Sequence, residues 1–235
     1  MGHTDMPARN EVQNRAREAD LLVEAAQGGD RNAFDQLVLR YRGRIFALAL
    51  HITGDASEAE DIAQEVFLRA YAQIGGFEGR SSFFTWLYRI ALNRAFNSRR
   101  DRKRRRSVKY DDDRVRMAVS VDAGGDPRLQ LELRETYWLL VQALDQLSPL
   151  LRATVVLTAL QGLNYREAAV VLDTTEPTVA WRVHEARKRL RVSMEKLARE
   201  PTPLPRHKTL QVPAELKQLM GRLTFDSSFP DPITS

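Results

Sequence analysis

The chain has 235 residues, of which 43% are hydrophobic and 29% are charged, and it contains no cysteine. This balance is typical of a soluble globular protein, and the absence of cysteine excludes disulfides, thiol nucleophiles and zinc sites built on thiolates. The formal net charge of +5 favours a polyanionic partner but does not establish one by itself.

No membrane-spanning or export segment is evident in the sequence. The longest purely apolar run covers only residues 45–50, whereas a helix that crosses a bilayer needs roughly 20 apolar residues. Residues 1–20 mix acidic and basic side chains and lack the apolar stretch of a secretory signal. We therefore expect a cytoplasmic protein without membrane insertion.

Residues 20–106 are expected to form a first helical domain. Their apolar side chains recur at spacings of three and four residues, the period of an amphipathic helix. Asp55 and Glu58 match a capping box, in which the first side chain binds free helix N–H groups and the glutamate reaches back, so a helix should begin there. Glycines within residues 75–79 should end that helix, and one of the serines at 81–82 can cap the next.

The composition changes after this domain. Residues 107–129 are rich in aspartate and glycine and show little helical periodicity, which predicts a flexible acidic linker. Helices resume over residues 130–199, where Ser148 and Pro149 supply an N-cap and a proline in the first helical turn. Repeated prolines over residues 200–235 predict an extended tail.

Two closely spaced helix starts in the second domain predict a helix-turn-helix. Asn164 and Glu167 match a second capping box, and Thr174 or Thr175 before Pro177 marks another helix start about ten residues later. Two short helices joined by a turn of three or four residues form the helix-turn-helix arrangement.

The second helix of this pair has an apolar face and a polar face. The apolar residues are Val179, Val183, Ala186, Leu190, Met194 and Leu197. The polar face presents Thr178, Trp181, Arg182, Glu185, Lys188 and Arg189. Such a helix can read base edges in the major groove of DNA, or it can be a solvated amphipathic helix whose Trp181 packs against a neighbour. This segment alone leaves both interpretations open.

A strongly basic block follows an aromatic helix in the first domain. Residues 99–106 contain seven basic side chains, and the helix before them carries Phe83, Phe84, Trp86, Tyr88 and Phe96. Basic side chains neutralise phosphates and aromatic rings stack on unpaired bases, so single-stranded DNA would suit this surface. Alternatively, most of the rings are core and the block complements the helix dipole, in which case only side chains such as Trp86 and Arg89 could face DNA.

A pair of carboxylates, Asp61 and Glu65, lies one helical turn apart with Gln64 and Leu68 adjacent. Such a pair could indicate a metal site or acid–base catalysis, but no histidine or third carboxylate completes a ligand set. The four histidines are scattered, and no glycine-rich phosphate loop is present. The sequence therefore predicts no catalytic, metal or cofactor site.

Three segments together closely resemble the signature segments of extracytoplasmic-function (ECF) sigma factors, the alternative sigma-70 factors that direct bacterial RNA polymerase to promoters. They are residues 59–67, 76–93 and 165–169, and their order and spacing also match. The resemblance implies an all-α fold with two small helical domains joined by the acidic linker. The implied ranges are an N-terminal extension 1–19, sigma domain 2 over 20–106, a linker 107–129, helix-turn-helix sigma domain 4 over 130–199 and a proline-rich tail 200–235.

The resemblance also implies partners and the residues that would contact them. Core RNA polymerase would be bound through the clamp helices and the flap, with a docking face of Asp61, Gln64, Glu65 and Leu68 on the clamp helices. The residues implied at the minus-ten element are Phe77, Arg80, Ser81, Trp86, Arg89, Asn93 and Asn97. The residues implied at the minus-thirty-five element are Thr178, Trp181, Arg182, Glu185, Lys188 and Arg189.

The loop over residues 76–82 would receive a flipped minus-ten base, which couples recognition to DNA melting because unstacking costs a few kcal/mol. An anti-sigma factor is a further implied partner, and no obligate homo-oligomer is expected. Three features depart from the family pattern: Pro177 stands where glycine is usual, Trp181 stands where a small residue is usual, and the tail is longer.

Two other functions fit the sequence less well. A helix-turn-helix regulator that does not join polymerase would have no need of the Asp61 face. An enzyme that acts on nucleic acid would need a convergent metal or acid–base site, and the sequence offers none.

Overall fold

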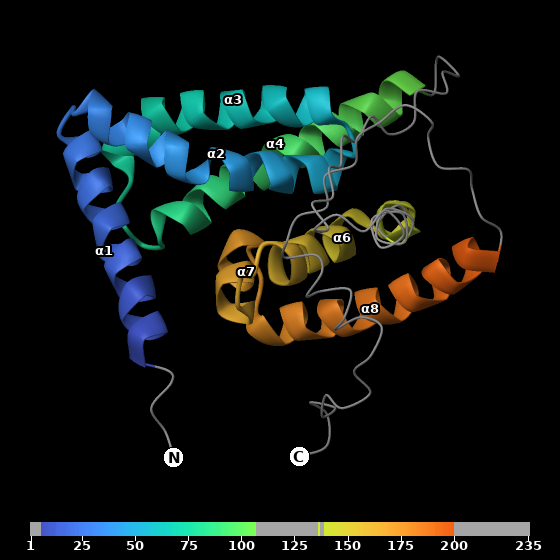
Figure 1. The fold of residues 1–235 in the computed structure, drawn as a ribbon. Helices are drawn as coiled ribbons and strands as arrows, with labels where there is room; N and C mark the ends of the chain where they lie inside the picture. The colour runs from blue at the N-terminus through green and yellow to red at the C-terminus, as the bar shows by residue number, and fades with distance from the viewer. Residues whose placement is uncertain (1–5, 107–135, 137–138, 200–235) are drawn as a thin grey trace, which may run out of the picture.

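All regular structure in the described residues is helical, as predicted. The computed structural model describes residues 6–106, 136 and 139–199. These residues form two helical units, which we call the N-terminal domain (residues 6–106) and the C-terminal domain (residues 136 and 139–199) (Figure 1). The expected linker and tail lie outside the described residues. In the part of the chain described here, no helix is both long enough and apolar enough to cross a bilayer.

The N-terminal domain consists of four long helices and one short turn of 3-10 helix. The elements are α1 (Met6–Gln27), α2 (Arg31–Thr53), α3 (Ala56–Gln73), η1 (Ile74–Gly76) and α4 (Phe83–Arg106). Helices α2, α3 and α4 run alongside one another, and α1 extends from one end of this bundle at a steep angle (Figure 1). Helix α1 begins before residue 20, so the expected domain boundary falls inside a helix.

The predicted start signals position these helices. The Asp55 side chain accepts a hydrogen bond from the Glu58 N–H at 3.0 Å and caps α3. The Glu58 carboxylate accepts a hydrogen bond from Ser98 and so links α3 to α4. Ser82, not Ser81, caps α4, since its Oγ accepts a hydrogen bond from the Thr85 N–H at 3.2 Å. Helix α2 ends at Thr53 and is capped by Gly54, whose φ of 74° suits a residue without a side chain.

The C-terminal domain contains the predicted helix-turn-helix. Residues 139–146 are helical and are followed by α6 (Pro149–Val155), the π-helical turn η2 (Val156–Leu160), α7 (Tyr165–Val171) and α8 (Glu176–Arg199). Asn164 and Glu167 form both bonds of the expected capping box, each at 2.9 Å. In η2 the Gln161 N–H donates to the Val156 carbonyl, five residues back, at 2.9 Å.

The core of each domain is built from the predicted apolar stripes. In α8, Val179, Val183, Ala186 and Leu190 are buried, while Met194 and Leu197 are half-buried. In the N-terminal domain Leu87 and Ala91 of α4 are fully buried, and Phe84 is half-buried. The apolar face of each DNA-binding candidate is therefore committed to packing, and only the opposite face remains for a partner.

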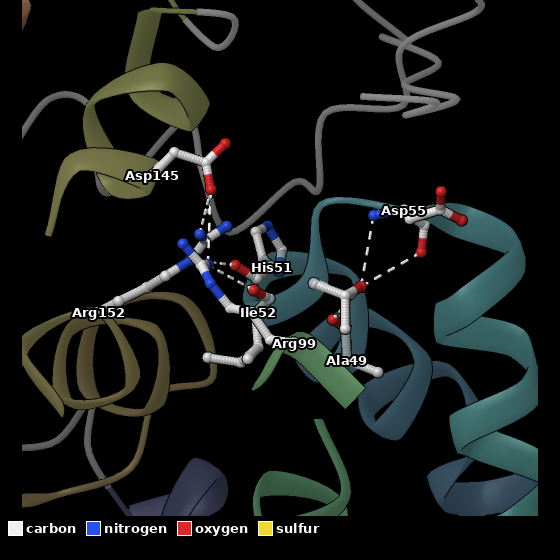
Figure 2. Close-up of polar contacts among 8 residues, drawn as sticks. Ala49, His51, Ile52, Asp55, Arg99, Asp145 and Arg152 are labelled. Carbon is white, nitrogen blue, oxygen red and sulfur yellow. Dashed lines mark hydrogen bonds and ion pairs between the residues drawn. The ribbon is translucent and has the colours of Figure 1, made fainter. Parts of the chain in front are cut away.

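The two domains pack against each other. Helix α7 lies against α4, and η2 lies against α2 (Figure 1). Tyr88 of α4 donates a hydrogen bond from its hydroxyl to the Gln161 side-chain oxygen at 2.6 Å. No local sequence pattern predicts this contact, because its partners are 73 residues apart along the chain. Arg152 of α6 makes a second contact, donating a hydrogen bond from Nε to the His51 carbonyl of α2 at 2.7 Å (Figure 2).

Candidate nucleic-acid interface

An aromatic surface forms where the loop after η1 meets the start of α4. The Phe77 ring lies 5.2 Å from the Trp86 ring and 5.9 Å from the Phe83 ring, measured between centroids. Phe83 is buried, whereas Phe77 and Trp86 are half-buried and keep part of their rings accessible. Rings held in this way can offer a stacking face to an unpaired base.

This loop is tied down by a residue that sequence reasoning missed. Gln27, at the end of α1, donates hydrogen bonds from Nε2 to the Ile74 carbonyl at 3.0 Å and to the Phe77 carbonyl at 2.7 Å. These bonds join residues about 50 positions apart, which local patterns do not reveal. The backbone at Phe77 is therefore held in place before any ligand binds.

A row of polar side chains continues from the aromatic surface along α4. Arg89, Asn93 and Asn97 are exposed and recur every four residues, so they share one face of the helix. Each step along this row rises about 6 Å along the helix axis. The row can thus offer hydrogen-bond donors and acceptors to successive bases.

Of the two remaining predicted minus-ten residues, Ser81 lines a cleft and Arg80 precedes it in the chain. Arg80 is exposed and pairs with Glu78 at 2.5 Å, and Ser81 is half-buried. The cleft has a volume of about 1010 Å³ and is lined on one side by Phe77, Glu78, Gly79 and the serines at 81–82. Its other walls come from α1, α2 and the C-terminal domain.

The recognition helix α8 exposes a large aromatic side chain. Trp181 is 60% exposed, so it does not pack against a neighbour among the described residues as the alternative interpretation required. Lys188 and Arg189 are also exposed, and Glu185 accepts a hydrogen bond from Arg189 at 2.6 Å. That bond lowers the pKa of the Glu185 carboxyl.

Two of the predicted minus-thirty-five residues, Thr178 and Arg182, are partly buried within the protein. The Thr178 and Thr175 hydroxyls hydrogen-bond to each other at 2.8 Å at the start of α8, and Thr178 is half-buried. Arg182 is half-buried, and its Nη1 atom is buried without a hydrogen-bond partner among the described residues. Trp181, Lys188 and Arg189 are therefore the more accessible side chains on this face.

The predicted docking face on α3 separates into two kinds of residue. Asp61, Gln64 and Leu68 are exposed. Glu65 is half-buried and is engaged by Arg94 of α4 and by Arg69, the latter at 2.6 Å. The hydrogen bond from Arg94 is the main reason that the pKa of the Glu65 carboxyl is lowered. The spacing of Glu65 predicted a carboxylate that faces solvent freely. In the structure Glu65 instead links α3 to α4.

A groove that the sequence did not reveal lies beside this face, between α2 and α3. Its volume is about 750 Å³, and its lining includes Phe34, Val38, Phe46, Gln64, Leu68 and Tyr71. Leu68 and Tyr71 are exposed at its edge, and the Phe34 and Tyr71 rings meet edge to face at 5.0 Å. An apolar groove whose charged lining residues are of both signs can accept a helical partner.

Two stretches of the chain match known families. Residues 37–105 match the family described as Sigma-70 region 2, and residues 137–190 match the family described as Sigma-70, region 4. The first stretch contains the α3 face and the α4 surface, and the second contains the helix-turn-helix.

Similar curated proteins span the same part of the chain. The RNA polymerase sigma-H factor of Pseudomonas aeruginosa is 37% identical over 186 residues, covering 76% of this chain and 95% of that protein. The ECF RNA polymerase sigma-E factor of Escherichia coli strain K12 is 32% identical over 185 residues, with the same coverage.

Two solved structures resemble this one. The sigma factor RpoE in complex with the anti-sigma factor NepR from Bartonella quintana is 26% identical, with a TM-score of 0.56, covering 69% of this chain and 96% of that chain. CnrH in complex with the cytosolic domain of CnrY is 25% identical, with a TM-score of 0.55, covering 79% of this chain and 99% of that chain.

Proposed function

The chain belongs to the ECF family of sigma-70 RNA polymerase factors, and we propose which of its surfaces carry the tasks of such a factor. The α3 face binds core polymerase. Helix α4 and the loop before it read the minus-ten element, and α8 reads the minus-thirty-five element. As a sigma factor it directs RNA polymerase to promoters and is not itself an enzyme. The proposal concerns which residues carry each of these tasks.

The observation that carries the proposal is the aromatic surface of Phe77 and Trp86 continuing into the row on α4. A base that leaves the DNA stack loses a few kcal/mol, and a stacking face returns about 1 to 3 kcal/mol per base. The Phe77 surface is already fixed through Gln27, so little ordering remains to be done when the base arrives. Ser81 lines the cleft beside it, and Arg80 is the exposed residue before it in the chain, so both can contact the flipped nucleotide.

The row along α4 extends the same contact to the strand that follows. Asn93 and Asn97 can donate to and accept from base edges, since an amide side chain offers both groups. Arg89 lies between the aromatic surface and these amides and can pair with a phosphate. Recognition and strand separation would then occur on a single helix.

For α8 we propose a division between base and phosphate contacts. Trp181 and Arg182 lie in the N-terminal half of the helix, the part of a recognition helix that reaches base edges. Trp181 offers an apolar face to a thymine methyl group, and Thr178 and Glu185 complete the base-facing side. Lys188 and Arg189 lie one to two turns further along and would contact phosphates.

For core polymerase we propose that Leu68 is the apolar anchor and that Asp61 and Gln64 form its polar rim, on the clamp helices of the largest subunit. Leu68 is 72% exposed and borders the groove between α2 and α3, so a partner helix could bury it. Glu65 would act from behind this face, by holding α3 against Arg94 of α4. The C-terminal domain would contact the polymerase flap.

Regulation by an anti-sigma protein is part of the proposal. Two of the similar solved structures are complexes with an anti-sigma factor or with the cytosolic domain of another protein. We infer that this chain is also held by such a protein and acts in the cytoplasm.

The test is reconstitution with core polymerase. The purified chain should co-elute with core polymerase and support run-off transcription from a subset of a promoter library. A chain that bound duplex DNA specifically but neither bound core polymerase nor supported transcription would overturn the proposal and would favour a helix-turn-helix regulator.

A further inference from the structure

The loop between α3 and α4 is tied to the end of α1 by a single side chain. The Nε2 group of Gln27 donates to the Ile74 carbonyl at 3.0 Å and to the Phe77 carbonyl at 2.7 Å. In the part of the chain that the structure describes, no other side chain hydrogen-bonds to the backbone of residues 74–80. Gln27 therefore determines where the backbone of this loop lies relative to α1.

The partners of the Gln27 amide set its orientation. Both partners are carbonyl oxygens, which only accept hydrogen bonds, so the nitrogen of the amide must face them. A side-chain amide has two N–H donors, and here each of them has an acceptor in the loop. Both donors of Gln27 are thus engaged by the loop before any DNA is present.

The turn that follows Gln27 is itself fixed on both sides. Gly29 has a φ of 96°, a conformation that favours glycine, and the Asp30 N–H donates back to the Ala25 carbonyl of α1 at 3.0 Å. The Asp30 carboxylate then accepts a hydrogen bond from the Asn32 N–H at 2.8 Å and caps α2. Gln27 is therefore held at a defined place between α1 and α2, and it can hold the loop against both helices.

The bond to the Phe77 carbonyl acts on the ring that we propose to receive a base. The Phe77 ring lies 5.2 Å from the Trp86 ring, and beyond Phe77 the chain passes through Gly79, whose φ is 68°, to the α4 cap at Ser82. The loop is thus anchored by Gln27 at one end and by Ser82 at the other. Loss of the first anchor would leave the backbone at Phe77 free to take up several positions.

Gln27 lies outside the stretch that matches the Sigma-70 region 2 family, since that stretch begins at residue 37. Helix α1 packs against η1 and α2, and its Val23 and Ala26 side chains are buried. An element that precedes the matched stretch therefore supports the proposed minus-ten loop.

We propose that Gln27 is a positioning residue for promoter opening: it holds the backbone at Phe77 in the shape that receives the flipped base, so α1 takes part in DNA melting through this loop. This inference rests on the proposed minus-ten role of Phe77. A loop that is fixed beforehand needs less ordering when the base arrives. Loss of the Gln27 bonds should therefore slow the opening of duplex DNA and leave binding to core polymerase unchanged.

Gln27→Met tests the proposal, because methionine has nearly the length and helix propensity of glutamine but no hydrogen-bond donor. With the variant holoenzyme, permanganate footprinting on duplex promoter should show opening slowed about three- to tenfold, as expected for the loss of two partly exposed hydrogen bonds. On a pre-melted promoter the variant should match the parent chain. Gln36→Met is the matched control, since Gln36 is an exposed glutamine of α2 whose side chain makes no hydrogen bond with the described residues. It should leave both rates unchanged.

A measurement on the free full-length chain reports on the loop without DNA. The chain contains three tryptophans, so labelling with 5-fluorotryptophan gives three fluorine NMR signals, and Trp86→Phe identifies the signal of Trp86. Because the Phe77 ring lies beside Trp86, movement of the loop changes the surroundings of that label. Gln27→Met should shift or broaden the Trp86 signal alone, and Gln36→Met should change none of the three. Circular dichroism verifies that each variant is folded.

Phe77→Ala shows whether Gln27 acts through Phe77. If it does, adding Gln27→Met to Phe77→Ala should slow opening far less than Gln27→Met slows it in the parent chain. Any one of four results overturns the proposal: an unchanged Trp86 signal, normal opening of duplex promoter by Gln27→Met, equal slowing on the pre-melted promoter, or fully additive slowing in the double variant. If Phe77→Ala slows opening and Gln27→Met does not, the minus-ten assignment stands without a positioning role for Gln27. If Phe77→Ala also opens duplex promoter normally, the assignment and the proposal both fail.

Discussion

The two helices proposed to contact DNA have the same length, 24 residues each, but are held very differently. Helix α4 is bonded to α3 through Ser98 and Arg94, and to the C-terminal domain through Tyr88. Helix α8 buries one apolar stripe and leaves Trp181 unpacked. A surface that captures a flipped base must exist before the base arrives, whereas a helix that enters a duplex groove can be ordered by the groove itself.

A fall in pH should have the largest effect of all, and it should destabilise the N-terminal domain, which contains α4, before the C-terminal domain, which contains α8. His51 is buried in the last turn of α2, and burial lowers its pKa to about 4 from 6.5, while its Nδ1–H donates to the Ala47 carbonyl at 2.6 Å. The unfolded chain binds a proton first, so stability that is complete above pH 6.5 should fall as the pH decreases from 6.5 to 4, by about 3 kcal/mol in all.

Urea unfolding at several pH values, followed by a probe in each domain, measures this effect. The loss should begin in the N-terminal domain, and His51→Leu should flatten the pH dependence in that window. An equal pH slope in the parent chain and in His51→Leu would show that other groups are responsible.

The preformed surface on α4 should matter most at the melting step. Phe77→Ala removes a stacking face worth about 1 to 3 kcal/mol, so promoter opening should slow about ten- to a hundredfold. Permanganate footprinting on duplex promoter measures opening. A pre-melted promoter is the control, and on it the variant should recover most of its activity, whereas normal opening of duplex promoter would place the base pocket elsewhere.

On α8 the effect should depend on DNA sequence instead of on melting. Arg182→Ala and Trp181→Ala should change which minus-thirty-five sequences are selected, at about 1 to 3 kcal/mol for a base contact. Lys188→Ala should weaken all sequences alike and reduce the salt dependence. Selection from a randomised minus-thirty-five library distinguishes the two, and an unchanged selection in both Trp181→Ala and Arg182→Ala would remove α8 as the reader.

The smallest expected effect concerns the ion pair through which α3 stabilises α4. Asp61→Lys should weaken binding to core polymerase without changing the melting temperature, because Asp61 is exposed. Glu65→Lys should weaken binding and also lower the stability of the N-terminal domain, by about 1 kcal/mol after allowing for solvent screening, because it breaks the pair with Arg94. Equal melting temperatures for the two variants would show that the Arg94 pair adds nothing.

Local features of the fold were readable from the sequence. The capping box at Asn164, the buried stripe of α8 and the helix start after Asp55 all follow from residues within one or two turns of each other. The family resemblance then gave the all-α two-domain architecture and the function as a sigma factor.

Contacts across the fold were not readable. Arg152 and His51 are 101 residues apart, and Tyr88 and Gln161 are 73 apart, so no periodicity connects them. Glu65 has the spacing of a solvent-facing carboxylate. Only the position of Arg94 on a neighbouring helix shows that Glu65 forms an ion pair between α3 and α4. The exposure of a side chain was therefore predictable where a face is defined by its own helix, as for Arg89 and Asn93, while their contact with DNA stays a prediction.

The π-helical turn η2 determines where Gln161 points. It accommodates one residue more than a regular helical turn, and it ends at Gln161, whose N–H reaches back to Val156. Deleting a single residue within Val156–Leu160 would restore a regular α-helix and rotate everything after it by about 100° about the helix axis. The Gln161 amide would then turn away from Tyr88, and the helix-turn-helix would leave α4 with its own capping box and core intact. A change of chain length at this one turn should thus uncouple the two domains without altering any side chain that we propose to contact DNA.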